Sequence, residues 1–500
     1  MTDRDQPSPS AFPTFRAMPR WLVRSVVWLW RKTWRYVTAV VGLLVIAHLV
    51  LNVVAGRRLE AELARLRAEG APLTLAEAAP PKVPDSQNAA VLYQKAFEQA
   101  FAGSERRKEK EEEVVAAFLA FAVGRPAHRP RPTLAEVEAM LARHEADFRL
   151  LEQGSLRPAC RFPVDWDNPN PWEMLFPHLG GVRQATRFLA AKALVDAERG
   201  RAGEALNDLA IAIRMSNHIS AEPTLIAQLV RVACIGIVSE ALPGVLAAVP
   251  PTAGESPPSY DLLSKMDLMG PWARAMEGER CCGLAVFDQV RRAKSGDVAV
   301  AMFSMGGPTS GLGRWLSRLA LTHMWPLTRV VWAPFLKLDE VYNLRQMERV
   351  TALHKQPYRI SYADYERLSK NIEESTPWYA VLSGILTPGF DRASAARDKG
   401  IACIGLMQAA LALRAYQIEH GSYPASLADL RAAGGWAIPD DPFSGKPFIY
   451  RREGAGCLIY SVGENMKDDG GIDEATVRNM PPRGTARRPL TWDLPLRMTR

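Results

Sequence analysis

An uninterrupted apolar run dominates the hydrophobic pattern of this chain. From residue 36 to 55 the sequence YVTAVVGLLVIAHLVLNVVA has 20 residues without a formal charge. A helix rises about 1.5 Å per residue, so this run spans about 30 Å, the thickness of a bilayer core. The pattern predicts a transmembrane helix. Its polar residues His48 and Asn52 share a face, where they bind a partner helix or approach the outer interface.

Basic and aromatic residues precede this run. Residues 1 to 35 form a basic segment rich in Trp and Arg. Six lysines or arginines lie within about 20 residues before the span, against four arginines soon after it. Because cytoplasmic flanks carry the excess of positive charge, we expect a cytoplasmic N-terminus and a large domain on the other side. The run is long for a cleaved signal peptide and continues as helix, so the sequence predicts a single-pass signal anchor.

The pattern beyond the anchor is mainly helical. Residues 56 to 123 predict a stalk that continues the transmembrane helix, ends near Gly70 and leads to a helix over 87 to 122. Residues 134 to 248 predict a helical hairpin domain, in which one helix ends at Gly200 and a second follows after a tight turn. The hairpin looks like one tetratricopeptide-type unit, although no second copy is found.

Two further apolar stretches raise the question of additional spans. The stretch TLIAQLVRVACIGIVSEAL contains Arg231 and Glu240, so it predicts a core helix of the body. Residues 259 to 390 predict a second helical region. Within it the stretch LALTHMWPLTRVVWAPFL, over 319 to 336, contains two prolines and Arg329, which predict a buried or membrane-grazing segment rather than a span.

The C-terminal part changes from helix to strand. Residues 391 to 475 predict an α+β module in which a helix over 392 to 420 precedes antiparallel strands near 447 to 452 and 456 to 461. Residues 476 to 500 predict a basic disordered tail. The expected fold class is therefore mainly α, with one N-terminal transmembrane helix, a helix-hairpin body and a small α+β module.

This module resembles the globular domain of the type II secretion major pseudopilin over about 80 residues. The residues that carry the likeness are Tyr416, His420, Gly421, Tyr423, Pro424, Leu427, Leu430, Asp441, Pro442, Gly445, Pro447, Tyr450, Tyr460, Ser461, Gly463, Gly470 and Gly471. The whole chain also resembles uncharacterised membrane-anchored proteins of planctomycete-type bacteria, a likeness that implies no activity. With the anchor, these likenesses indicate a bacterial inner membrane protein whose bulk is periplasmic.

The chain departs from the pseudopilin pattern in two places. A pseudopilin stem follows a processing glycine and leads straight into the globular part, whereas the span here lies some 340 residues upstream, so we do not expect a processed fibre subunit. The family also binds calcium in the loop after its last strand. Here that loop has Asn465 where the family tends to have Asp. It still offers oxygen atoms that suit either calcium or a solvated acidic turn, from Asn465, Asp468, Asp469 and Asp473.

Charge and cysteine content exclude some classes. The formal net charge of +8 is concentrated at the two ends of the chain, and the body between them is near neutral, so we expect no nucleic-acid partner. The six cysteines lack metal-site spacing and predict mainly buried thiols, with one bridge left open for an oxidising compartment.

No catalytic signature stands out. The eight histidines form no HExxH pattern, and no nucleophile or phosphate-loop motif is found, so the sequence identifies no small-molecule substrate. Asp165, Asp167 and Glu173 could pair as acid and base, although turn chemistry is the simpler interpretation. We therefore expect a membrane-anchored interaction or assembly protein with envelope or secretion-system partners. The alternative is an envelope hydrolase with a carboxylate-based site in the helical body.

Overall fold

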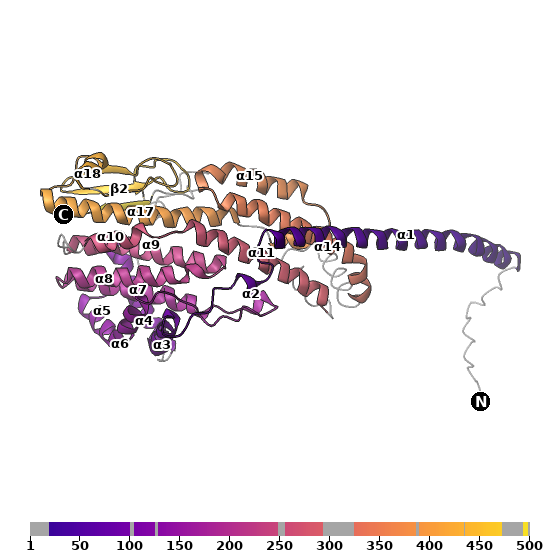
Figure 1. Ribbon diagram of the computed structural model, residues 1–500, viewed down its shortest axis with the longest axis horizontal. Helices are drawn as coiled ribbons and strands as arrows, with labels where there is room; N and C mark the ends of the chain where they lie inside the picture. Colours follow the sequence, from indigo (N-terminus) through magenta and orange to yellow (C-terminus); the bar gives the residue numbers. More distant parts are fainter. Residues whose placement is uncertain are drawn as a thin grey trace, which may run out of the picture.

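The computed structural model describes residues 20–100, 105–125, 129–248, 256–293, 325–386, 390–434, 436–472 and 494–498. The chain is mainly helical and contains a three-stranded antiparallel sheet. One long helix projects from an elongated body in which helices lie side by side (Figure 1). The predicted fold class is confirmed at this level.

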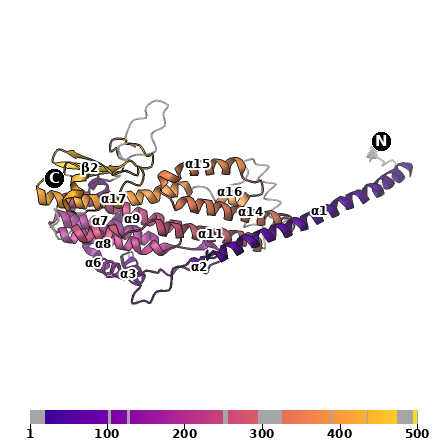
Figure 2. The same cartoon turned by 45° about the horizontal axis from the view of Figure 1, so that its top comes forward.

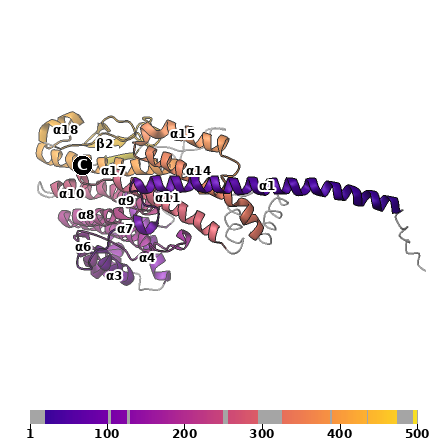
Figure 3. The ribbon, with the colours of Figure 1, turned by 45° about the vertical axis from the view of Figure 1, so that its right-hand side comes forward.

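The projecting helix is α1 (Arg20–Ala68), 49 residues long. It contains the predicted span and the predicted stalk without interruption. Its N-terminal part extends away from the body, and its C-terminal part lies along the body (Figures 1 and 3). Leu59 and Leu66 are buried against Leu284, Val341 and Leu344, which anchors the stalk to the helices behind it.

The first layer of the body contains short helices. These are α2 (Leu75–Ala78), α3 (Ala89–Ala100), α4 (Glu105–Ala122), α5 (Leu134–Leu141) and α6 (Glu145–Ser155), with a 3₁₀ turn η1 (Ala142–His144). α3 and α4 replace the single helix expected over 87 to 122. Thr133 and Glu136 form a reciprocal capping box that fixes the start of α5.

Three long helices form the centre of the body. They are α7 (Pro177–Glu198), α8 (Ala202–His218) and α9 (Leu225–Ala248). The 3₁₀ turn η2 (Pro171–Glu173) precedes α7, and the 3₁₀ turn η3 (Ile219–Ala221) follows α8. The helix pair predicted around Gly200 is confirmed. Gly200 has a φ of 82°, a left-handed conformation that glycine adopts without a Cβ clash, and this allows the tight turn between α7 and α8.

A further set of helices lies next to the stalk. It comprises α10 (Ser256–Ser264), α11 (Met269–Arg292), α14 (Trp325–His354), α15 (Tyr358–Ser375) and α16 (Val381–Leu386). The turn between α14 and α15 is held by buried charges, because Arg397 donates to the carbonyl oxygens of His354 and Gln356. Asp398 accepts a hydrogen bond from the Tyr358 backbone at 2.7 Å.

The C-terminal unit consists of α17 (Phe390–His420), α18 (Leu427–Gly434) and the sheet β1 (Ile449–Glu453), β2 (Gly456–Ser461) and β3 (Leu494–Met498). The register pairs Ile449 with Tyr460 and Leu458 with Arg497. The two strands expected from the sequence are confirmed. β3 corrects the expectation for the tail, since residues 494–498 are a paired strand and not disordered.

The C-terminal unit shares its core with the helical body. A single cluster of buried apolar side chains extends from Ala89 on α3 to Met498 on β3. α17 lies between α9 and the sheet, so it contributes to both parts (Figures 1 and 2). The units predicted over 134 to 248 and 391 to 475 are therefore packed into one body.

Candidate functional site

The exposed apolar part of α1 is the first candidate surface. Within the described residues three helices are long and apolar enough to cross a membrane: α1, α9 and α17. None of the apolar window of α1 is buried, whereas 50% of that of α9 and 72% of that of α17 are buried inside the body. Leu43, at 67% exposed, represents the uncovered side chains of α1. This helix therefore presents an apolar surface that no part of the described body covers.

The start of α1 has the features of a membrane boundary. The Lys32 Nζ atom lies 5.1 Å from the centre of the Trp28 ring, and both side chains are exposed. Indole rings prefer the headgroup region, and lysine extends its charge towards water. From residue 20 onward, the predicted Trp/Arg-rich segment forms the first turns of α1. Residues 1 to 19 lie outside the described part of the chain.

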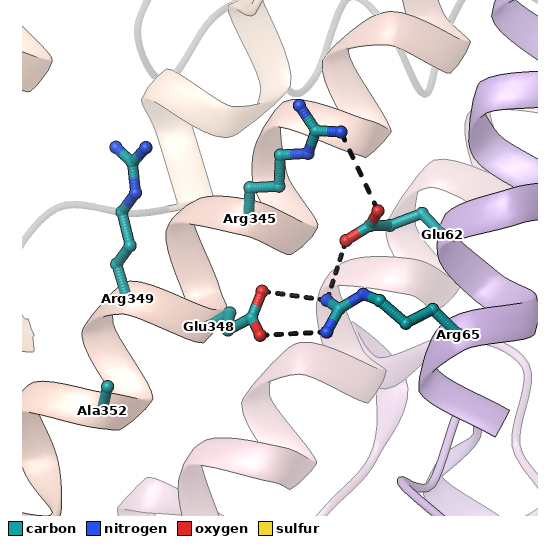
Figure 4. Close-up of a pocket in the computed structure, with 6 residues that line it drawn as sticks. All are labelled: Glu62, Arg65, Arg345, Glu348, Arg349 and Ala352. Atoms are coloured by element: carbon teal, nitrogen blue, oxygen red, sulfur yellow. Dashed lines mark hydrogen bonds and ion pairs between the residues drawn. The ribbon is translucent and has the colours of Figure 1, made fainter. Parts of the chain in front are cut away.

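The second candidate surface is the junction where the stalk meets α14. A shallow, open pocket of about 460 Å³ is lined by Glu62 and Arg65 of α1 and by Arg345, Glu348, Arg349 and Ala352 of α14. Arg65 donates to both carboxylate oxygens of Glu348, at 3.1 and 2.9 Å, and to Glu62 at 2.9 Å (Figure 4). These contacts hold the stalk against the body by paired charges.

Electrostatics at this junction favour a fixed ion-pair network. Hydrogen bonds to Glu62 and then to Glu348 raise the pKa of Arg65 above its usual value, so its charge is permanent. Arg345 adds a longer contact to Glu62 at 3.9 Å. Because Arg65 and Glu348 are both substantially exposed, salt screens the pair and its contribution to stability is small.

A third polar contact lies closer to the predicted span. The Lys337 Nζ atom donates to Asn52 Oδ1 at 2.9 Å and lies 3.5 Å from the place of a Cβ on Gly56. Along α1, Asn52 comes before Arg65. Their partners on α14 come in the same order, Lys337 before Glu348, so the two helices are parallel. Of the two roles predicted for Asn52, the structure supports contact with a partner helix, which belongs to the same chain.

A groove with several aliphatic lining residues lies between α4, α7 and α9. It encloses about 200 Å³ and is lined mainly by Ala116, Leu119, Ala120, Ala122, Val123, Leu194, Ile237 and Ala241. Arg125 and Glu240 form an ion pair at 2.9 Å at its edge, and Arg187 also borders it. Aliphatic side chains beside charged ones make this hollow a candidate contact surface. Glu240, a residue that argued against a second span, thus forms part of this rim.

Buried histidines and carboxylates are the groups that a hydrolase would need. His144 contacts Glu111 and Asp147, each at 3.1 Å, and His178 contacts Glu222 at 2.8 Å. All five side chains are buried within the packing of the first layer and α7. Such pairs tie helices together, because a buried polar group needs a partner.

A second buried network lies between α7 and α8. Lys192 donates to Asp196 at 2.7 Å and to Asp208 at 3.0 Å, and Arg201 also binds Asp196. Burial raises the pKa of Asp208 to about 8 despite the nearby lysine. Burial also opposes ionisation of Asp196, yet hydrogen bonds from Lys192 and Arg201 lower its pKa below the usual value. The pair therefore holds one charged and one mostly neutral carboxyl group at neutral pH.

The acidic residues considered for acid–base chemistry lie in a surface turn. Asp165, Asp167 and Glu173 are exposed, and the Asp165 carbonyl accepts a turn hydrogen bond from the Asn168 backbone at 3.3 Å. Asn170 caps the short η2 helix through its side chain. These contacts favour the turn interpretation.

The predicted calcium ligands lie in the loop after β2. Asn465 donates to Asp469 at 2.7 Å, and Asp468 accepts from the Tyr460 hydroxyl and the Gly470 backbone, each at 2.8 Å. The structure thus brings three of the four residues together, while Asp473 lies outside the described residues. Within the described part of the chain no group of three or more acidic, histidine or cysteine side chains is arranged to hold a metal. Calcium at this loop stays a prediction.

The six cysteines form no disulfide bond in the structure and are mostly buried. All six are free, and only Cys282 among them is partly exposed. Burial raises the pKa of Cys281 to about 12, which keeps this thiol protonated and unreactive at neutral pH.

Sequence reasoning missed the partners of the stalk and the groove. Lys337 and Glu348 carry no local signal that links them to α1, and the small residues of α4 look like an ordinary helix surface.

Comparison of the chain with family models, with curated proteins and with solved structures finds no match.

Proposed function

We propose that this chain is a membrane-anchored interaction or assembly protein of the bacterial inner membrane. In this proposal α1 crosses the membrane once, the N-terminus is cytoplasmic and the body lies on the periplasmic side. The body then binds envelope components, such as those of a secretion or pilus-like system. The charge distribution around the span supports the orientation.

One observation carries the proposal. The apolar part of α1 is uncovered and continues without a break into a stalk that is packed along α14. A helix of about 30 Å with this surface is stable only if lipid or another protein covers it. Because the stalk is packed against the body, the body is held at a fixed distance from the lipid or protein that covers the apolar part of α1.

The groove between α4, α7 and α9 supports the interaction role. It holds about 200 Å³, which is room for an apolar side chain of a partner, and the Arg125–Glu240 ion pair at its edge offers charges to the groups beside that side chain. The unit formed by α17 and the three-stranded sheet supports a link to secretion, because its sequence resembles the pseudopilin domain. These two features give the proposal a site and a class of partner.

Orientation is tested with reporter fusions. A periplasm-active phosphatase fused after residue 500 should be active, and the same enzyme fused before residue 1 should be inactive. The reverse pattern would overturn the orientation, and activity of neither fusion would remove the single-span arrangement.

Binding at the groove is tested by photo-crosslinking in native membranes. A photoreactive amino acid at Ala122, an exposed residue at the groove, should give a defined adduct, whereas one at Ala455 on the β1–β2 turn provides the control. The groove variant Leu119→Gln, with an unchanged helix content confirmed by circular dichroism, should reduce the adduct from Ala122. Equal adducts from both positions would show nonspecific capture and contradict docking at the groove.

The envelope hydrolase is the alternative function. It would use the buried pairs His144–Glu111 or His178–Glu222. If mild-detergent purification recovers no stoichiometric partner, hydrolase screening of the full chain with Glu222→Gln as the comparison variant decides this alternative.

A further inference from the structure

The first turns of α14 carry an apolar surface that the described body leaves uncovered. Leu327 is 57% exposed, Val330 56% and Val331 49%, and Trp332 is also exposed. Trp378, in the loop before α16, is 70% exposed. Large exposed apolar side chains that gather in one region mark a contact with another molecule or with a membrane.

Aromatic rings form the centre of this surface. The ring centroids of Trp332 and Phe335 lie 5.8 Å apart, those of Phe335 and Trp378 4.9 Å, and those of Trp378 and Tyr379 5.9 Å. Asp339 on α14 fixes the start of α16, which follows the loop that carries Trp378, because its carboxylate accepts a hydrogen bond from the Leu382 backbone at 2.8 Å. The aromatic rings of α14 and of the loop before α16 therefore contact one another and form one continuous surface.

The place of this surface along α1 identifies what covers it. α14 is parallel to α1, and Lys337 contacts Asn52 near the outer end of the predicted span. Leu327 precedes Lys337 by ten residues, with Pro334 between them, and a proline inside a helix bends it. The first turns of α14 thus turn aside near the outer end of the span instead of running along α1 to its middle (Figures 1 and 3). Figures 1 and 3 show this start of α14 at the end of the body from which α1 emerges.

Charge also favours a lipid surface. From residue 325 to 338 the sequence WPLTRVVWAPFLKL has Arg329 and Lys337 but no acidic residue. Basic side chains next to tryptophan and aliphatic residues are typical of helices that lie in a membrane interface. The lysine and arginine side chains bind anionic headgroups, and the indole rings of tryptophan lie at headgroup depth.

We infer that the first turns of α14, with Trp378 and Tyr379, insert into the outer-leaflet interface of the membrane that α1 spans. The inference rests on the membrane anchoring proposed above and adds a second, shallow membrane contact. Two contacts fix the tilt of the body, whereas a single helix would leave stalk and body free to tilt and rotate together in the membrane. The surfaces of the groove would then face a defined direction.

The experiment measures the depth of single labels on the full chain in nanodiscs. Each disc holds one copy in phosphatidylethanolamine and phosphatidylglycerol. An environment-sensitive fluorophore is attached at Val330→Cys, at Leu44→Cys in the span, or at Glu204→Cys on exposed α8. Quenching by iodide reports water, and quenching by lipids spin-labelled at shallow or deep positions reports depth. The unsubstituted protein, treated identically, corrects for the native thiols.

We expect the label at 330 to be quenched by the shallow lipid label and several-fold less by iodide than the label at 204. The deep lipid label should quench only the label at 44. A label at 330 that is open to iodide while that at 44 is in lipid would overturn the inference and leave the anchor intact. A label at 44 that is open to iodide would overturn the anchor and the inference with it.

A label at 330 that neither iodide nor lipid reaches would show that protein covers the surface, which also overturns the inference. A second label at Leu327→Cys guards against a local effect of the first substitution. It should report the same environment, and a label at 327 open to iodide would contradict insertion of these turns.

Discussion

Lys337 and Asn52 join two helices through residues that lie 285 positions apart in the chain, with the Lys337 Nζ atom donating to Asn52 Oδ1 at 2.9 Å. This contact lies at the edge of the predicted span, where α1 leaves the body. It turns a polar residue of an apolar helix into a fixed connection between anchor and body. The orientation of the whole body on its stalk depends on such contacts.

Loss of this connection should weaken the docking of the stalk. Lys337→Met removes the donor and leaves the Asn52 amide oxygen without this partner, so we expect a loss of about 1 kcal/mol in the free energy of unfolding. Thermal unfolding in mild detergent measures it. Lys355→Met, at an exposed position just after α14, is the control and should have almost no effect. Equal stabilities of the two variants would contradict a role for the contact.

The carboxyl pair between α7 and α8 should respond to pH with opposite signs. The pKa of Asp208 is raised to about 8, so the folded state binds a proton that the unfolded state releases near pH 4. Stability therefore falls as pH rises from about 4 to about 8, and Asp208→Asn should remove this fall. Denaturant unfolding at several pH values between 5 and 8 measures the slope.

Asp196 behaves in the opposite way, because its pKa is lowered. Its contribution is complete above the pKa of the unfolded chain and is lost as pH falls through the lower folded value. Asp196→Asn leaves Lys192 and Arg201 without their charged partner, so we expect a loss of about 3 kcal/mol at pH 7. If Asp208→Asn costs more than Asp196→Asn at this pH, the assignment of charge within the pair is wrong.

The contact of α11 with the segment before α9 should tolerate no side chain at Gly278. A Cβ at this position would lie 1.7 Å from the Pro223 carbonyl oxygen, so Gly278→Ala must move the backbone of one segment. We expect a loss of about 3 kcal/mol, measured by thermal unfolding. Gly236→Ala on α9 is the control, because its Cβ would meet nothing within 4 Å. Better helix propensity should then add about 0.5 to 1 kcal/mol.

The third strand should be part of the folded core. Leu496 is 3% exposed on β3, and its neighbour Arg497 is exposed. Leu496→Asp would bury a carboxylate, so we expect a loss of about 3 to 4 kcal/mol and faster proteolysis of the C-terminal unit. Arg497→Asp breaks only a surface contact to Glu453 and should cost less than about 1 kcal/mol. Similar losses in the two variants would mean that β3 does not pair as described.

Local pattern was enough to predict the helices and two of the strands. The span and stalk of α1, the turn at Gly200 and the long helix that ends at His420 follow from short-range periodicity, charge and turn residues. These signals act within a few residues, because helix propensity and capping depend on near neighbours. Local pattern failed at residues 494–498, where the apolar residues alternate but a proline among them argues against a paired strand.

The candidate surfaces depended on tertiary structure. The sequence by itself determined that α1 has an apolar span with a basic flank, and that residues near 330 are apolar with interspersed breaks. Only the fold decided that α14 lies parallel to α1, that Lys337 meets Asn52, and that α4, α7 and α9 enclose a groove. The physical reason is that such contacts depend on how distant helices pack, and packing is set by the shape of the whole core and not by any local run of residues.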